Sequence, residues 1–320
     1  MNTRHFTIPA TADDIKLATA VMEPDDVSVS KGIFQFVHGM TEHKEYYFPL
    51  MEWLVDKGFI CVIHDHRGHG ASARGLDDFG YMDKGGWRAM VEDVKAVGDW
   101  AKEEYRNISD APLPFIMFGH SMGSMVVRSY IKRYDDTIDA LFVCGSPSDN
   151  PAKGLGKILA WLFGVLKGWH YRPELIQKIG FGRNNDNCQE DAKKYKKAWV
   201  CSDKDFLEIY HNDPICGFTF TSNGFYNLSA LMIDCYDAYG WKLAKPDLPI
   251  KFIAGEYDPC IRSEQEFHEA VQLLREIGYT DVSDKIYPGM RHEVHNETDR
   301  IIVWNDILEY VENKVKLRYL

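Results

Sequence analysis

The chain has 320 residues, 45% of them hydrophobic, and a formal net charge of −11. A chain of this length can bury a large core, either as one α/β domain with an insertion or as two smaller domains. Phosphate contacts supply much of the affinity of nucleic-acid-binding proteins. Because the chain is acidic and its single basic stretch is 193–197, we do not expect it to bind nucleic acid.

Cysteine usage and the N-terminal residues bear on the cellular compartment. The seven cysteines are widely spaced and include no C-x-x-C pair, so they favour a reducing environment over a disulfide framework or a zinc knuckle. Residues 1–26 contain no apolar segment like that of a signal peptide. The longest apolar run, 158–166, is too short to span a bilayer. We therefore expect a cytoplasmic protein.

The N-terminal half predicts a sheet covered by helices. Residues 5–10 and 14–23 alternate between apolar and polar side chains, as antiparallel strands do. Short apolar runs then alternate with helical segments. The predicted strands are 32–39, 59–65, 113–120 and 138–145, and the predicted helices are 46–58, 86–105 and 122–134. Apolar strands separated by helices are typical of a parallel sheet with helices on both faces, which is an α/β fold.

This alternation is interrupted once. Residues 147–243 contain helical segments, aromatic residues and asparagine-rich turns, but no convincing buried strand. The pattern resumes with strands at 248–255 and 281–289 and with helices from Ser263 and over 299–315. We therefore predict one α/β core formed by 1–146 and 244–320, with 147–243 inserted as a helical cap.

The segment HDHRGHG, residues 64–70, raises the question of a metal site. Its histidine spacing resembles the start of the H-x-H-x-D-H zinc motif, but Gly68 occupies the aspartate position. The segment follows a predicted strand, where its glycines favour a sharp turn. We therefore favour a scaffold turn, with Asp65 and Arg67 as a buried pair or as backbone anchors, over bound zinc.

The pentapeptide GHSMG, residues 119–123, follows a predicted strand and opens a predicted helix. This is the setting of a nucleophile elbow, in which a tight turn lifts a serine above the sheet and glycines avoid clashes. A serine nucleophile needs a base and a group that orients the base. Ser121 is the predicted nucleophile.

In this arrangement the acid and the histidine follow the serine in the chain. Asp258 lies just after the strand 248–255, where sites of open α/β sheets are found; Glu256 is its local competitor. His292 follows the strand 281–289 and is favoured over His295, which lies nearer the last helix.

Two backbone N–H groups must point at the oxyanion that forms on the substrate. One belongs to the residue after the nucleophile, Met122, and the other to the loop after an earlier strand. Met40, in the loop that follows the strand 32–39, is the predicted second donor.

These motifs together resemble the α/β-hydrolase superfamily, and within it the serine hydrolases that include monoacylglycerol lipases, lysophospholipases and serine aminopeptidases. The matching segments are HGMTEHKEYY (38–47), DHRGHGAS (65–72), GHSMGS (119–124), DFLEIYHNDP (205–214), GEYDP (255–259) and GMRHEVHNE (289–297). The resemblance implies a mostly parallel twisted sheet, a Ser121–His292–Asp258 triad, a mobile helical cap over an acyl pocket, and no metal or cofactor. One departure is Thr41, which stands where many members carry glycine.

The predicted cap suggests the kind of substrate. Residues 156–169, GKILAWLFGVLKGW, are apolar nearly all round, so this helix either is buried or meets something apolar. It could line an acyl channel, rest transiently on a membrane or micelle surface, or pack on the core or on a dimer partner.

We expect an esterase that cleaves a monoacylglycerol or lysophospholipid through an acyl-enzyme. An aminopeptidase of the same fold is the first alternative, with Glu42 or a cap acid holding the substrate amine. The second is a non-catalytic interaction protein, which is disfavoured because all three triad positions carry working residue types.

Overall fold

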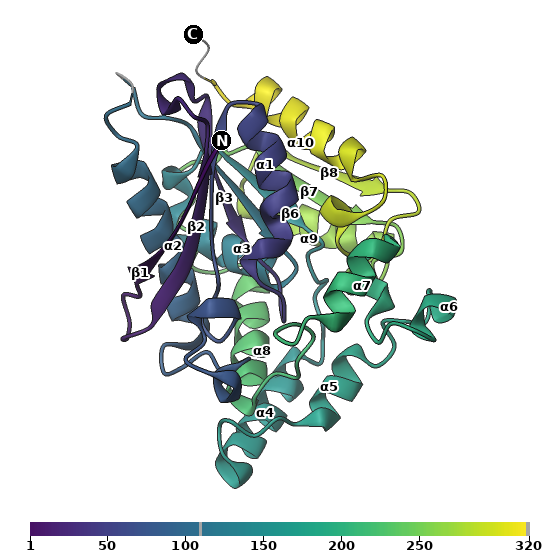
Figure 1. Ribbon diagram of the computed structural model, residues 1–320. Helices are drawn as coiled ribbons and strands as arrows, with labels where there is room; N and C mark the ends of the chain where they lie inside the picture. Colours follow the sequence, from purple (N-terminus) through teal and green to yellow (C-terminus); the bar gives the residue numbers. More distant parts are fainter. Residues whose placement is uncertain (109–110, 318–320) are drawn as a thin grey trace.

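The computed structural model describes residues 1–108 and 111–317, and its centre is a sheet of eight strands in the order β1-β2-β4-β3-β5-β6-β7-β8 (Figure 1). The strands are β1 (Asn2–Pro9), β2 (Lys16–Glu23), β3 (Gly32–Val37), β4 (Phe59–His64), β5 (Phe115–His120), β6 (Ala140–Cys144), β7 (Ile250–Gly255) and β8 (Val282–Tyr287). β2 is antiparallel to both of its neighbours, β1 and β4, and all other pairs are parallel. The predicted α/β fold with a mostly parallel sheet is confirmed.

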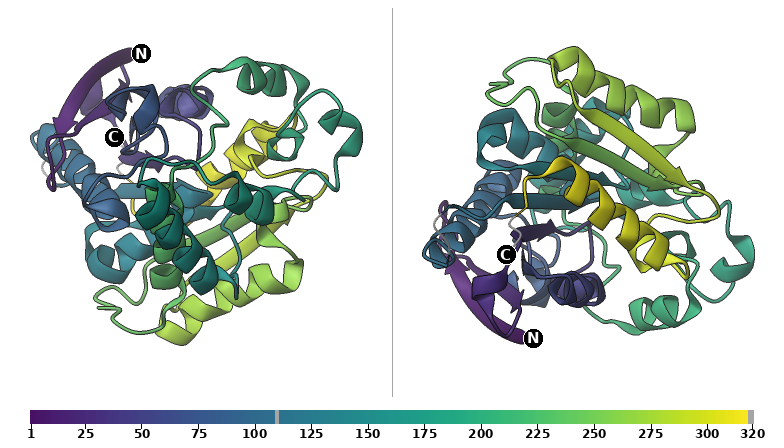
Figure 2. Two further views of the ribbon diagram at one scale, coloured as in Figure 1. Left: turned by 90° about the horizontal axis from the view of Figure 1, so that it is seen from below. Right: turned by 90° about the horizontal axis from the view of Figure 1, so that it is seen from above.

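Helices cover both faces of this sheet. α2 (Gly86–Glu104), α3 (Met122–Tyr134) and α9 (Glu264–Ile277) pack on one face, and α1 (Phe48–Asp56) and α10 (Arg300–Lys314) pack on the other. Figure 2 shows α9 and α10 on opposite sides of the sheet. The central strands supply both cores by alternation: Phe115 and Met117 face the α2 side, whereas Ile116 and Phe118 face the α1 side. This two-sided burial explains why the strands β3 to β6 are mostly apolar.

Five α-helices lie between β6 and β7 in the chain. They are α4 (Lys153–Lys167), α5 (Glu174–Phe181), α6 (Gln189–Ala192), α7 (Lys204–Asn212) and α8 (Ser222–Tyr236). They gather at the end of the molecule opposite the two termini (Figure 1). Residues 145–249 are all described and contain no strand, so these helices form an insertion in the core; the limits 147 and 243 stay a prediction.

Within the insertion, α4 packs on α8, with Gly156 of α4 close to Ser229 of α8, and the Trp169 ring covers Gly164. Among the helices of the described residues, none is both long and apolar enough to cross a membrane.

The turn after β4 is held by ion pairs that differ from the predicted one. The buried Arg67 guanidinium forms a two-pronged bond with Asp93 on α2, at 2.8 and 3.1 Å, and contacts Asp13 at 2.7 Å. Asp65 binds Lys44 Nζ at 2.8 Å and accepts backbone N–H groups of Lys44 and Ala71. Asp65 is therefore a backbone anchor, but the expected Asp65–Arg67 pair is wrong because each residue has an oppositely charged partner from another part of the chain.

The three histidines of this turn pack inside the core. Burial lowers the pKa of His64 to about 3 and that of His69 to about 4, so these rings are neutral. The backbone N–H of His66 donates to His38 Nε2 at 2.8 Å, and the two rings lie 4.3 Å apart. The imidazoles thereby tie the β4 turn to the loop after β3.

Candidate active site

Ser121 lies in the turn between β5 and α3 with φ of 53° and ψ of −118°. This left-handed backbone is rare for a residue with a side chain and marks a strained turn. A Cβ atom on Gly123 would lie 2.1 Å from the Val37 carbonyl oxygen, and one on Gly119 would lie 2.5 Å from Val127. Both glycines of the pentapeptide are therefore required by close packing around the elbow.

Asp258 and His292 meet at the carboxyl ends of β7 and β8. His292 Nδ1 lies 2.8 Å from Asp258 Oδ1, and both side chains are almost completely buried. Burial by itself lowers the pKa of an imidazole, but the negative charge of Asp258 outweighs it and raises the pKa of His292 well above 6.5. The pair is therefore arranged so that Asp258 stabilises a positively charged His292.

Ser121 and His292 line the same cavity. The hydrogen bonds of the described residues do not include one between Ser121 Oγ and His292; His292 Nε2 instead lies 4.0 Å from Cys260 Sγ. In substrate-free enzymes such catalytic contacts are often long and tighten when substrate binds.

The two local competitors of the acid and the histidine lie elsewhere. Glu256 is exposed and accepts the backbone N–H of Gly289 at 2.8 Å. His295 is fully buried, stacks on Tyr47 with ring centroids 4.9 Å apart, and has its pKa lowered by burial. The geometry therefore pairs Asp258 with His292 and leaves the competitors in structural positions.

Met40 and Met122, the predicted oxyanion donors, both line the cavity. Within the described residues, neither the Met40 nor the Met122 backbone N–H has a protein acceptor, as expected of groups that wait for a substrate oxygen. Thr41, which follows Met40, has φ of 61°, a left-handed backbone that favours glycine.

Glu42 is a residue whose structural role the sequence did not indicate. Its buried carboxylate accepts the backbone N–H of Gly39 and the Tyr47 hydroxyl, and it lies 3.3 Å from His120 Nδ1. Burial raises its pKa, but His120 and these hydrogen bonds outweigh burial and lower the pKa to about 2. Glu42 thus holds the Met40 loop instead of presenting a free carboxylate; the sequence signal for it is its place in the segment 38–47, three residues after Gly39.

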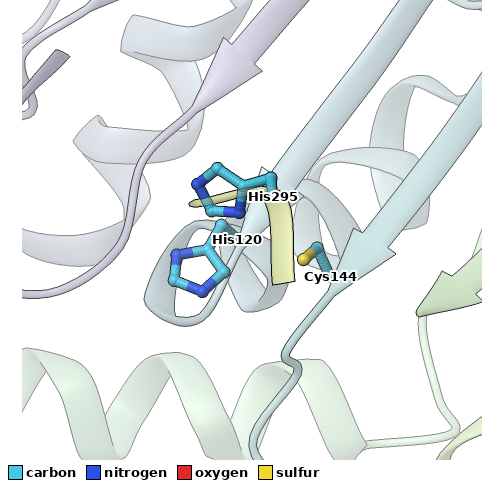
Figure 3. A group of neighbouring side chains, drawn as sticks. All are labelled: His120, Cys144 and His295. Carbon is cyan, nitrogen blue, oxygen red and sulfur yellow. The ribbon is translucent and has the colours of Figure 1, made fainter. Parts of the chain in front are cut away.

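His120, Cys144 and His295 form a buried group beneath the elbow, with possible ligand atoms within 4.8 Å of one another (Figure 3). A metal would require the Cys144 thiolate, yet burial raises the pKa of this thiol well above its usual range. His120 is already engaged by Glu42 and by the His292 carbonyl oxygen at 3.3 Å. The group fits a role as packing that supports the elbow better than a role as a metal site.

The cavity above Ser121 has a volume of about 460 Å³ and two kinds of lining. The apolar lining comes mainly from α4, α5 and α8: Leu155, Leu159, Ile176, Ile179, Phe225, Leu228 and Met232. The polar lining comes mainly from the Met40 loop, residues 184–197 and α7: Thr41, Asn184, Asn185, Lys196, Lys197 and Tyr210. A smaller number of polar side chains lie on or beside the apolar helices, namely Lys153, Gln177, Ser229 and Arg262. An amphiphilic molecule would match such a division.

The sheet, the elbow and the Asp–His pair after the last two strands define a protein of the α/β-hydrolase fold. Residues 28–299 match the family described as serine aminopeptidase, S33. Because this match spans most of the sequence, the chain belongs to that family.

Individual relatives agree with this assignment. A monoacylglycerol lipase of Mycolicibacterium smegmatis is 25% identical over 303 residues, which are 93% of each chain. A monoglyceride lipase of Saccharomyces cerevisiae is 20% identical over 88% of this chain and 85% of the relative. The crystal structure of a carboxyl esterase from Bacillus coagulans superposes with a TM-score of 0.87, at 25% identity, over 98% of this chain and 99% of that one. The chain is a carboxylic ester hydrolase similar to monoacylglycerol lipases.

Proposed function

We propose that this enzyme hydrolyses carboxylic esters of monoacyl lipids, either monoacylglycerols or lysophospholipids, through a Ser121–His292–Asp258 triad. The observation that carries the proposal is the divided cavity above Ser121, because its apolar lining suits one acyl chain and its polar lining suits an alcohol head group. Similarity to monoacylglycerol lipases supports the same substrate class.

The proposed reaction has two halves. Ser121 Oγ attacks the ester carbonyl while His292 takes its proton, and the Met40 and Met122 amides bind the oxyanion. The tetrahedral intermediate collapses, His292 gives the proton to the leaving alcohol, and an acyl-enzyme remains. Water activated by His292 then attacks the acyl-enzyme and releases the fatty acid. Asp258 orients the imidazole and stabilises its charged form.

An aminopeptidase reaction is the main alternative, and a substrate comparison separates the two. A substrate amine would need an available carboxylate, but Glu42 is engaged by the Met40 loop, and Lys197 places a cation in the cavity. We expect p-nitrophenyl acyl esters to be cleaved, with a preference among chain lengths, and aminoacyl p-nitroanilides to be resistant. Faster cleavage of the anilides would contradict the proposal.

The activity should depend on pH through His292. The base must be neutral to accept the serine proton, and the Asp258 charge raises its pKa well above 6.5. Activity therefore falls as pH drops below the pKa of His292 in the folded enzyme and rises as pH increases through it. We expect kcat/KM for p-nitrophenyl butyrate to rise with a midpoint above 6.5. A flat profile, or a midpoint below that value, would argue against a histidine base with this partner.

We also propose that the cap meets aggregated substrate through an apolar face. The exposed residues of this cap face are Leu155, Ile158, Trp161, Leu162, Val165 and Leu166 on α4, with Leu175 and Ile179 on α5. Two lysines, Lys157 and Lys167, lie on α4 together with six of these apolar residues. Helices that rest on lipid surfaces combine apolar and basic side chains in this way.

Changing two residues of the cap face tests this contact. We expect the double variant Trp161→Ser, Leu166→Ser to bind lipid vesicles roughly tenfold more weakly in a sedimentation assay, because less apolar area leaves water. Ile302→Ser, which changes an exposed apolar residue of α10, serves as the control. Unchanged vesicle binding, or a wild-type dimer that the double variant dissociates, would assign the cap face to a protein partner instead.

A further inference from the structure

Lys197 lies at the junction of the two loops that would form the reaction centre. Its Nζ donates a hydrogen bond to Thr41 Oγ1 at 3.2 Å, next to the predicted oxyanion donor Met40. The residues that follow Lys197 contact the histidine loop: the Trp199 ring lies 4.9 Å from that of His292, and the Val200 carbonyl accepts the Glu293 N–H at 2.7 Å. The Lys197 side chain therefore reaches the polar part of the cavity close to Ser121.

Lys197 differs from Lys44 and Arg67 in having no carboxylate partner in the described part of the chain. Within residues 1–108 and 111–317, no carboxylate oxygen lies within 4.0 Å of its Nζ, whereas the buried cations Lys44 and Arg67 each have one at 2.8 Å. Burial lowers the pKa of Lys197 to about 8, so the ammonium form still predominates near neutral pH. An ammonium has three N–H donors, and among the residues that the structure describes Thr41 is the single hydrogen-bond acceptor for them.

The acidic groups of the cavity do not neutralise this cation. Glu42 is turned toward the Gly39 N–H, Tyr47 and His120. Burial and the neighbouring Glu42 raise the pKa of Glu293 well above its usual range, so Glu293 carries a proton. Lys196, which is exposed, adds a second positive charge to the same lining. This part of the cavity is therefore prepared for a negative group that comes with the ligand.

We propose that Lys197 forms an anion-binding subsite for the leaving alcohol, so that the enzyme prefers monoacyl esters whose alcohol carries a phosphate over neutral monoacylglycerols. The inference rests on the proposed function and selects the lysophospholipid branch of it. The acyl chain lies along the apolar lining from α4, α5 and α8, and the phosphate pairs with Lys197 in the polar lining. Lys197 then acts as a specificity-determining residue, since the neutral ester lacks the group that it binds.

A paired substrate test distinguishes recognition of charge from support of the Thr41 loop. The substrates are octanoyl-glycerol and octanoyl-glycerol 3-phosphate, which share one acyl chain. We expect Lys197→Met to lower kcat/KM for the phosphate ester about 10- to 100-fold, mainly through KM, and to change that for the neutral ester about threefold or less. Lys197→Arg should restore much of the preference. Lys193→Met is the matched control, because Lys193 is exposed and paired with Glu190.

Two results would overturn the proposal. If Lys197→Met lowers kcat/KM equally for both esters, Lys197 only supports the Thr41 loop. If Lys197→Met keeps the wild-type preference for the phosphate ester, Lys197 does not bind the phosphate. If the wild type cleaved neither ester, the proposed function would fail. In that case the anion-binding subsite is tested separately, by calorimetric measurement of glycerol 3-phosphate binding to the wild type and to Lys197→Met. Weaker binding to Lys197→Met than to wild type supports the subsite, and equal or absent binding refutes it.

Discussion

Replacing Ser121 with alanine is expected to lower kcat for p-nitrophenyl butyrate by a factor on the order of 10⁶. In the proposed mechanism the hydroxyl forms the acyl-enzyme, so its removal should stop the reaction at the first step. The fold should be retained, since alanine fits the same backbone position and the glycines around the elbow are unchanged. Steady-state kinetics and thermal unfolding of the purified variant measure both effects.

A second serine provides the control. Ser30 is buried, and its hydroxyl has no hydrogen-bond partner among the described residues, so Ser30→Ala should keep both activity and labelling by a fluorophosphonate probe. The probe should label the wild type and fail to label Ser121→Ala. Near wild-type turnover by Ser121→Ala would show that Ser121 is not the nucleophile. Lack of labelling in a folded wild type would favour the non-catalytic alternative.

Replacing Arg67 with methionine should lower the free energy of unfolding by about 3–5 kcal/mol. Arg67 and Asp93 are both fully buried and joined by two hydrogen bonds. Burial raises the pKa of Asp93 to about 6, even though Arg67 opposes that rise. Without Arg67, the Asp93 carboxylate is left in the core with no cation, and it must take up a proton or destabilise the fold. Urea denaturation followed by tryptophan fluorescence measures the change.

Two further variants test the cause. The double variant Arg67→Met, Asp93→Leu should recover most of the lost stability, because it removes the stranded charge together with its partner. Arg74→Met is the matched control: Arg74 is more exposed and pairs with Asp14 and Asp83 near the surface, so its loss should cost about 1 kcal/mol or less. Equal effects of Arg67→Met and Arg74→Met would show that the buried pair contributes little.

The parts of the fold that could be predicted from the sequence are those that depend on residues close to one another in the chain. A buried parallel strand must be apolar on both faces, and this requirement is visible in each run of β3 to β6. The elbow was also recognisable, because Gly119 and Gly123 are needed by backbone contacts within a few residues of Ser121 or on the adjacent strand. The order of the acid and the histidine after the serine then limited the choices to two residues in each of two loops.

The prediction for the β4 turn failed because partners there are distant in sequence. Asp65 and Arg67 are two residues apart, and their proximity suggested a pair. In the structure Arg67 bonds to Asp93, 26 positions later, and Asp65 bonds to Lys44, 21 positions earlier. Local spacing shows which charges are available in a turn, but not which strand or helix packs beside it.

The sequence by itself determined the α/β layering, the position of the elbow and the short set of residues for the acid and the base, because each follows from backbone geometry within a few residues. Only the tertiary structure decided that His292 rather than His295 bonds to Asp258. The same holds for Glu42 and for Lys197, whose partner Thr41 is 156 positions away. These contacts join the ends of different strands and the loops that follow them, or a loop and the insertion, and packing between segments far apart in the sequence leaves no periodic signal in the chain.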